Sequence, residues 1–109
     1  MDWITLDSVD QLSDINAKSF QKPQLIFKHS TRCSISSVIK NRLHKEQLPE
    51  SVDFYYLDLI AAREISNRIA ADYQVPHESP QVLLIKDGTC IFNESHMAIY
   101  MDDIIEQAQ

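Results

Sequence analysis

Short apolar runs alternate with amphipathic segments along this chain, and this alternation restricts the folds that it can adopt. The runs predicted to be strands span residues 3–6, 25–29, 52–59, 82–85 and 89–92. Between them, apolar residues recur at helical spacing after a cap at Asp7 or Ser8, from Cys33, over about residues 61–73, and from a cap at Ser95. The predicted order of elements is therefore β-α-β-α-β-α-β-β-α.

This order predicts how the strands pair. Strands that are joined through a helix are expected to lie parallel, with right-handed crossovers. Asp87-Gly88 is typical of a tight hairpin turn and joins the last two strands directly, which adds an antiparallel edge. The sequence thus predicts an α/β fold with a mixed central sheet and helices on both faces, in the element order of a thioredoxin fold. With 44% hydrophobic residues, the 109 residues are expected to form one domain over 1–109.

Composition argues against several classes of function. The net charge is −6, and lysines and arginines are scattered, so a surface that binds nucleic acid is disfavoured. The N-terminus lacks the features of a signal peptide, and no apolar run is long enough to span a membrane. Two cysteines are too few for a disulfide framework and fit a reducing compartment. We therefore expect a cytoplasmic protein without a membrane or nucleic-acid partner. The sequence leaves the oligomeric state open, and a monomer is the expectation.

Cys33 lies where the strand over residues 25–29 gives way to a helix that carries Ile35, Val38, Ile39 and Leu43 at helical spacing. Free backbone N–H groups and the helix dipole stabilise an anion at such a position, and Arg32 adds a positive charge. These features favour the thiolate, which is the nucleophilic form of cysteine. We interpret Cys33 as the catalytic nucleophile. The alternative is a buried structural cysteine, since cysteine is among the most buried residue types.

The residue three positions after Cys33 is Ser36, where a dithiol motif would carry its second cysteine. A hydroxyl cannot resolve a mixed disulfide, so an external thiol must do so. The pattern therefore predicts a monothiol reaction. Cys90 lies on the predicted edge strand and is interpreted as a half-buried packing residue without a catalytic role.

The histidines allow fewer conclusions. His29 precedes Cys33 by four residues and could stabilise the thiolate as a cation, or it could be a strand-end residue with access to solvent. His44, His77 and His96 are expected at the surface. No two histidines have ligand spacing, and Cys33 and Cys90 form no Cys-x-x-Cys clip, so no metal site is predicted.

Three motifs together carry a resemblance to a known family. They are Lys28-His29-Ser30-Thr31-x-Cys33-x-Ile35-Ser36, Glu78-Ser79-Pro80-Gln81-Val82 and the strand over residues 83–88. With them, nearly the whole chain resembles the bacilliredoxins of the YtxJ type, which are thioredoxin-like monothiol proteins of bacillithiol-producing Gram-positive bacteria. In that family proline often follows the active cysteine, whereas this chain has Ser34.

The resemblance implies a function and a set of site residues. The function is removal of bacillithiol from S-bacillithiolated cytosolic proteins, with Cys33 accepting the small thiol, bacillithiol as co-substrate and no tightly bound cofactor. Pro80 is implied to follow a cis peptide bond and to face Cys33, while the backbone of Ser79 pairs with a substrate strand. Thr31, Arg32 and Ser36 complete the predicted substrate-binding set, together with Ser79 and Pro80. The alternative is a non-catalytic thioredoxin-like module that senses oxidants or binds proteins.

Overall fold

The computed structural model describes residues 3–30, 32 and 34–109 and has one mixed five-stranded sheet. The strands are β1 (Ile4–Thr5), β2 (Gln24–His29), β3 (Asp53–Asp58), β4 (Gln81–Lys86) and β5 (Thr89–Ser95). The helices are α1 (Asp10–Lys18), α2 (Ser34–His44), α3 (Arg63–Tyr73) and α4 (Met101–Ala108), with a short 3₁₀ helix η1 (His96–Ala98) before α4. The predicted α/β class and order of elements are confirmed.

The strands lie in the order β1-β3-β2-β4-β5, so β2 is central. β1, β3 and β2 are parallel, as predicted for strands linked through helices. The same prediction is wrong for β4, which runs antiparallel to β2 and pairs Gln81 with Lys28. After α3, the segment 74–80 leads the chain back to the end of the sheet where β3 finishes. β4 therefore starts beside the carboxyl end of β2. This return places Ser79 near the segment that follows β2.

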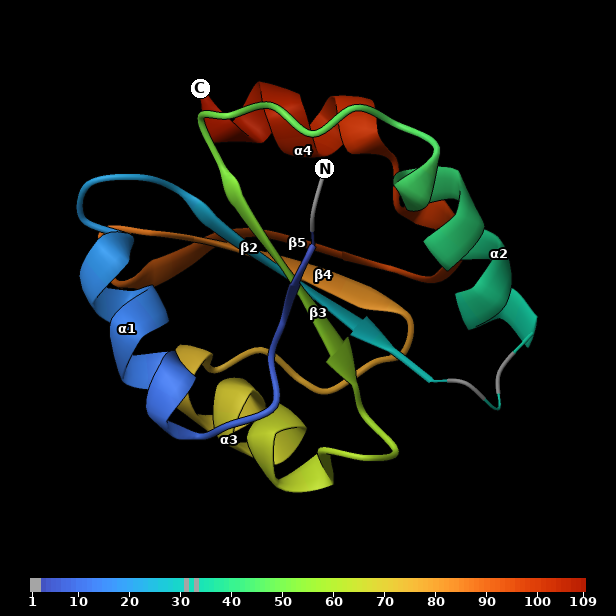
Figure 1. Ribbon diagram of the computed structural model, residues 1–109, viewed down its shortest axis with the longest axis horizontal. Coiled ribbons are helices and arrows are strands. Elements are labelled where there is room, and N and C mark those ends of the chain that lie inside the picture. Colours follow the sequence, from blue (N-terminus) through green and yellow to red (C-terminus); the bar gives the residue numbers. More distant parts are fainter. Residues whose placement is uncertain (1–2, 31, 33) are drawn as a thin grey trace.

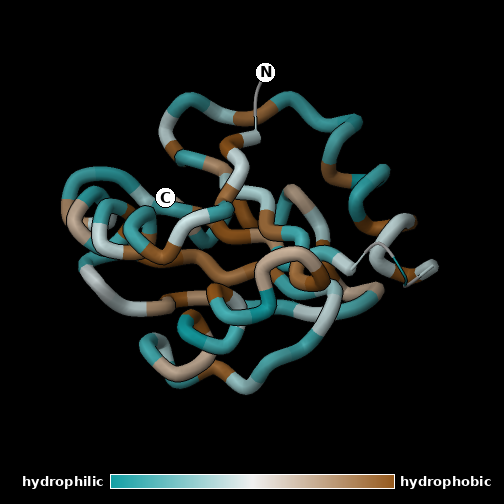
Figure 2. The backbone as a smooth tube through the Cα atoms, turned by 60° about the horizontal axis from the view of Figure 1, so that its bottom comes forward, coloured by the Kyte–Doolittle hydropathy of each residue, from teal (hydrophilic) through white to brown (hydrophobic). Residues whose placement is uncertain are grey.

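Helices cover both faces of the sheet, α1 and α3 on one side and α2 and α4 on the other (Figure 1). Each face has its own apolar cluster, one with Ile26, Leu57 and Leu83 and the other with Phe27, Phe54 and Leu84. All six residues of β2 are buried. Figure 2 shows the hydrophobic segments concentrated in the central strands and the hydrophilic ones in the surrounding helices and loops. Alternate side chains of the central strands thus form two cores.

The predicted hairpin between β4 and β5 is confirmed. Asp87 and Gly88 both have positive φ, at 54° and 75°, as a two-residue hairpin turn requires. Ser19, which follows α1, supports this turn: its carbonyl accepts the N–H of Asp87 and its Oγ accepts the N–H of Gly88, both at 2.9 Å. A Cβ on Gly88 would lie 2.9 Å from Cζ of Phe20.

The buried side of α2 differs from the prediction. Ile39 and Leu43 are buried, but Ile35 and Val38 are 41% and 50% exposed. The side chain buried in their place is the polar Ser36. Apolar spacing alone therefore identified the helix and only half of its packing side.

The ends of two helices also differ from the prediction. Ser95 does not start the last helix, because β5 continues to Ser95 and α4 begins at Met101. His96 has a φ of 57° and donates its N–H to the carbonyl of Pro80 at 2.9 Å, which interrupts the helical path. α1 begins at Asp10, later than a cap at Asp7 or Ser8 predicts, although Oγ of Ser8 accepts the N–H of Asp10 at 3.3 Å.

Among the described residues, no helix has the length and apolar character needed to cross a bilayer.

Candidate functional site

The candidate site lies where the chain passes from β2 into α2. The predicted nucleophile Cys33 and the predicted contact residue Thr31 lie outside the described residues, so their roles stay predictions. α2 begins at Ser34, the residue after Cys33, and its first turn carries no acidic side chain. Arg32 is exposed, and its N–H is 3.3 Å from Oγ of Ser30, which accepts it. The positive end of the helix dipole and the Arg32 guanidinium thus both favour an anion here.

Ser36 joins the two segments that the sequence assigned to the site. Its side chain is fully buried. Its Oγ accepts the N–H of Ser30 at 3.4 Å and lies 3.4 Å from Oγ of Ser79. The hydroxyl therefore connects the segment before α2 with the segment before β4. Direct contact between Ser36 and a substrate stays a prediction, since the contacts of its hydroxyl in the fold are with Ser30 and Ser79.

The Ser79-Pro80 peptide bond is cis, as the resemblance implied. Ser79 is half-buried and Pro80 is buried. The Pro80 carbonyl accepts the N–H of His96 at 2.9 Å, which ties this segment to the start of η1. The two motifs thus approach each other at Ser36 and Ser79, while the position of Pro80 relative to Cys33 stays a prediction.

His29 is buried, with only 2% of its surface exposed, so solvent access at the strand end was the wrong expectation. Its ring lies 5.9 Å from that of Phe27 and 5.5 Å from that of Tyr56, and its Nδ1 has no hydrogen-bond partner among the described residues. Burial lowers the pKa of His29, and the charge of Lys40 lowers it further. Both effects work against the cationic form that the predicted thiolate-tuning role requires.

Lys28 is a feature that the sequence analysis left without a role. It is fully buried in the central strand, and its Nζ donates to the carbonyl of Ser66 in α3 at 3.3 Å. Burial lowers the pKa of Lys28 to about 8. The available signal was a lysine directly after Leu25-Ile26-Phe27, since lysine is rarely fully buried without a partner.

Cys90 is half-buried on the edge strand β5, as predicted. It packs against the cluster on the α1 and α3 face, whereas the buried residues Ile39 and Leu43 of α2 belong to the other cluster. Its Sγ donates to the carbonyl of Phe92 at 3.3 Å, and burial raises the pKa of the thiol. These properties fit a packing residue, because a raised pKa reduces the thiolate fraction.

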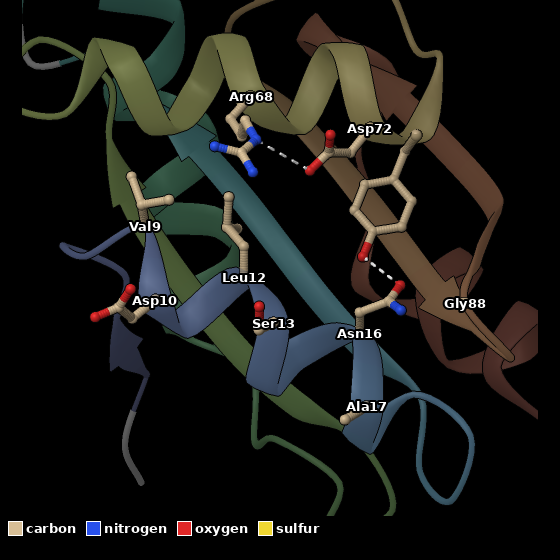
Figure 3. Close-up of a pocket in the computed structure, with 10 residues that line it drawn as sticks. Val9, Asp10, Leu12, Ser13, Asn16, Ala17, Arg68, Asp72 and Gly88 are labelled. Atoms are coloured by element: carbon tan, nitrogen blue, oxygen red, sulfur yellow. Dashed lines mark hydrogen bonds and ion pairs between the residues drawn. The ribbon is translucent and has the colours of Figure 1, made fainter.

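A groove of about 570 Å³ between α1 and α3 includes none of the predicted site residues (Figure 3). Along it, Nε of Arg68 lies 3.6 Å from a carboxylate oxygen of Asp72, and the Tyr73 hydroxyl donates to the Asn16 side chain at 3.0 Å. These four polar side chains are thus paired with one another, and the volume of the groove alone does not identify it as the functional site. Within residues 3–30, 32 and 34–109, no three histidine, cysteine or acidic side chains gather to hold a metal ion.

Solved structures resemble this fold over nearly its whole length. One, described as having a thioredoxin fold, is 29% identical, with a TM-score of 0.84 and coverage of 97% of this chain and 93% of the other. The thioredoxin of Malassezia sympodialis is 18% identical, with a TM-score of 0.76 and coverage of 97% and 88%. A mutant thioredoxin from Halobacterium salinarum is 15% identical, with a TM-score of 0.73 and coverage of 98% and 90%. The two thioredoxins show the fold alone.

The family model described as monothiol bacilliredoxin BrxC matches residues 4–104. That range contains Cys33 and both segments that meet at Ser36 and Ser79. A single cysteine before a helix, with a hydroxyl in the position of a second thiol, agrees with the monothiol character of this family. The thioredoxin fold with this motif is that of a thiol–disulfide oxidoreductase, and the chain belongs to the monothiol bacilliredoxin family.

Proposed function

We propose that this protein removes bacillithiol from S-bacillithiolated proteins of the cytosol. The observation that carries the proposal is the buried Ser36 hydroxyl, which contacts Ser30 and Ser79 from the position where a resolving thiol would stand. With a hydroxyl there, Cys33 can accept a small thiol and has no neighbouring thiol at this position to displace it. Membership of the bacilliredoxin family supports bacillithiol as that small thiol.

The reaction is a thiol–disulfide exchange in two steps. The Cys33 thiolate attacks the bacillithiol sulfur of the mixed disulfide, a new S–S bond forms, and the substrate protein leaves as a thiolate that takes up a proton. A second low-molecular-weight thiol, as its thiolate, then attacks the adduct, forms a small-molecule disulfide and releases Cys33 as thiolate. Each step breaks one disulfide and forms another, so no further oxidant is needed. Bacillithiol serves as co-substrate, without a tightly bound cofactor.

The start of α2 supplies the activation of the thiol in this proposal. Its unpaired N–H groups and the Arg32 charge stabilise the thiolate, and helix N-termini can lower a cysteine pKa from about 8.5 to roughly 3.5–7.5. His29 contributes less positive charge than an ordinary histidine, because burial and the charge of Lys40 lower its pKa. The helix and Arg32 therefore carry the activation.

The segment before β4 supplies substrate docking. We assign the backbone of Ser79 to pairing with an extended part of the substrate protein, as in recognition at a sheet edge. Thr31, Arg32 and Pro80 complete the contact surface in this assignment. The Ser36 hydroxyl contacts the Ser79 hydroxyl, so one side chain links the proposed docking segment with the segment that carries the nucleophile.

The experiment is transfer from a bacillithiolated model protein, followed by intact-mass measurement of both proteins. The wild type is expected to gain one bacillithiol on Cys33 for each substrate thiol released, and added bacillithiol should remove the adduct. Alkylation rates measured against pH provide a second readout. Cys33 should react at a pH well below that of an ordinary cysteine, and Cys90 serves as the internal control because burial raises its pKa.

Two results would contradict the proposal. If no adduct forms on Cys33 and its alkylation follows the pH dependence of a free cysteine, the protein is a non-catalytic module that senses oxidants or binds proteins. If the adduct forms and is then replaced by a disulfide between Cys33 and Cys90, the chain resolves its own adduct and is not a monothiol enzyme.

A further inference from the structure

Lys28 is a fully buried lysine on the central strand of the sheet. Its Nζ donates to the carbonyl of Ser66 at 3.3 Å, and no carboxylate pairs with it among the described residues. An ammonium group carries three N–H donors, and burying it without an anionic partner costs stability. The side chain does not reach solvent either, so neither ion pairing nor exposure of its charged end accounts for its position.

The contacts of Lys28 lead to the segment that precedes Ser79. Ser66, which accepts from Lys28 through its backbone, has its Oγ 3.2 Å from Nδ1 of His77. Gln81 is the partner of Lys28 in the pairing of β2 with β4 and is also buried. Its Nε2 donates to the carbonyl of Pro76 at 3.1 Å, and its Oε1 accepts the N–H of Glu78 at 3.4 Å.

The segment that ends at Ser79 is therefore contacted from both faces of the sheet. From the α2 side, the Ser36 hydroxyl contacts it directly. From the α3 side, Ser66, which accepts from Lys28, contacts His77, and the buried side chain of Gln81 contacts Pro76 and Glu78. The two sets of contacts fix the three residues before Ser79 and the side chain of Ser79 itself.

We propose that Lys28 is a positioning residue, which acts through Ser66 and His77 to hold the segment Pro76–Glu78 and thereby the docking position of Ser79. The inference rests on the proposed function, since it assigns Ser79 to docking of the substrate protein. Lys28 does not touch the substrate or the reacting sulfur atoms in this proposal. Its ammonium fixes the conformation of the segment Pro76–Glu78 from the α3 side of the sheet. This conformation matters only to a substrate that needs an extended backbone contact.

Lys28→Met tests the proposal, because methionine keeps an unbranched apolar stem and removes the ammonium. The transfer rate should fall roughly fivefold for a bacillithiolated protein, the factor expected for loss of one ordinary hydrogen bond, mainly through a higher KM. The rate with the small symmetrical disulfide of bacillithiol should be unchanged. Lys86→Met is the matched control, since Lys86 ends β4 beside the hairpin turn, and it should change neither rate. Equal losses with both substrates, or no loss with either, would overturn the proposal.

Ser66→Ala gives a second test through the same path. It removes the hydroxyl that contacts His77 and keeps the carbonyl that accepts from Lys28. Because the two residues act in series, the double variant Lys28→Met/Ser66→Ala should lose no more activity on the protein substrate than the less active of the two single variants. Losses that multiply would show independent effects and overturn the proposed path.

Hydrogen exchange separates this inference from the proposed function. The amides of His77, Glu78 and Ser79 should exchange faster in Lys28→Met than in the wild type, while those of β5 should not become faster. If wild-type protein transfers no bacillithiol at all, the proposed function fails, yet the exchange rates still decide whether Lys28 orders the segment. Unchanged exchange at these three amides would overturn the inference even in a fully active enzyme.

Discussion

Replacing Lys28 with methionine should raise the free energy of unfolding at neutral pH, and the gain should shrink as the pH rises. Burial lowers the pKa of Lys28 from its ordinary value of 10.5 to about 8. Below pH 8 the folded and unfolded forms both hold the proton, so the folded form bears the full cost of the buried charge. Between pH 8 and 10.5 the folded form releases the proton while the unfolded form keeps it, and the cost is progressively relieved.

The shift fixes the size of the effect. A tenfold change in a protonation equilibrium is worth about 1.4 kcal/mol, so the displacement of the Lys28 pKa corresponds to about 3 kcal/mol of destabilisation at neutral pH. By about pH 9.5 the linkage relation leaves about 1.4 kcal/mol of this cost. The stability advantage of Lys28→Met over the wild type should therefore fall by about 2 kcal/mol between about pH 6.5 and pH 9.5.

Urea denaturation of both proteins across this pH range, followed by circular dichroism, measures the difference. Tyr55 and Cys90 also have raised pKa values from burial, and they make alkaline pH less favourable to the fold. Because both groups are present in both proteins, their contribution cancels in the comparison. A stability difference that does not change with pH, or a variant less stable than the wild type at pH 7, would refute the reasoning about the buried charge.

Three further predictions concern the thiols, the Ser36 hydroxyl and the hairpin turn. Cys33→Ala should abolish bacillithiol transfer and Cys90→Ser should leave most of it, because Cys90 packs on the face opposite α2; equal losses by mass analysis would make Cys90 a resolving thiol. Ser36→Cys should oxidise to an internal disulfide with Cys33, since it restores the Cys-x-x-Cys spacing of a dithiol motif, and a persistent small-thiol adduct would contradict this. Gly88→Ala should lower the free energy of unfolding by about 1 kcal/mol, because φ is 75° and the exposed Phe20 can move aside, with transfer activity unchanged; an unaltered Tm would count against it.

Much of the fold could be predicted from the sequence because its signals are local. The apolar run at Leu25-Ile26-Phe27, the helical spacing of Ile65 and Ile69, and the Asp87-Gly88 turn each identify their element without reference to the rest of the chain. The direction of β4 could not be obtained this way. It depends on how the segment 74–80 leads back to the end of the sheet where β3 finishes, and on the pairing of β4 with the distant strand β2.

The site shows the same division. The cysteine, the hydroxyl three positions later and the Ser79-Pro80 motif are visible in the sequence, and the structure brings Ser36 and Ser79 together. The burial of Ser36 was not visible, because hydrophobic periodicity assigns polar residues to the surface, and that of Lys28 was indicated only by its place directly after Leu25-Ile26-Phe27. Each is buried with partners far along the chain: Ser79 for Ser36 and the Ser66 carbonyl for Lys28.

The central position of β2 has a consequence for synthesis of the protein. β2 pairs with β3 and β4, both of which follow it in the chain, and Ser36 meets a residue 43 positions later. Chains emerge from the ribosome N-terminal end first, so Cys33 and Ser36 are made long before Ser79 and β4. A truncated product that stops before Ser79 carries the thiol but lacks the proposed docking position and β4, and it should react with small disulfides without selecting protein substrates.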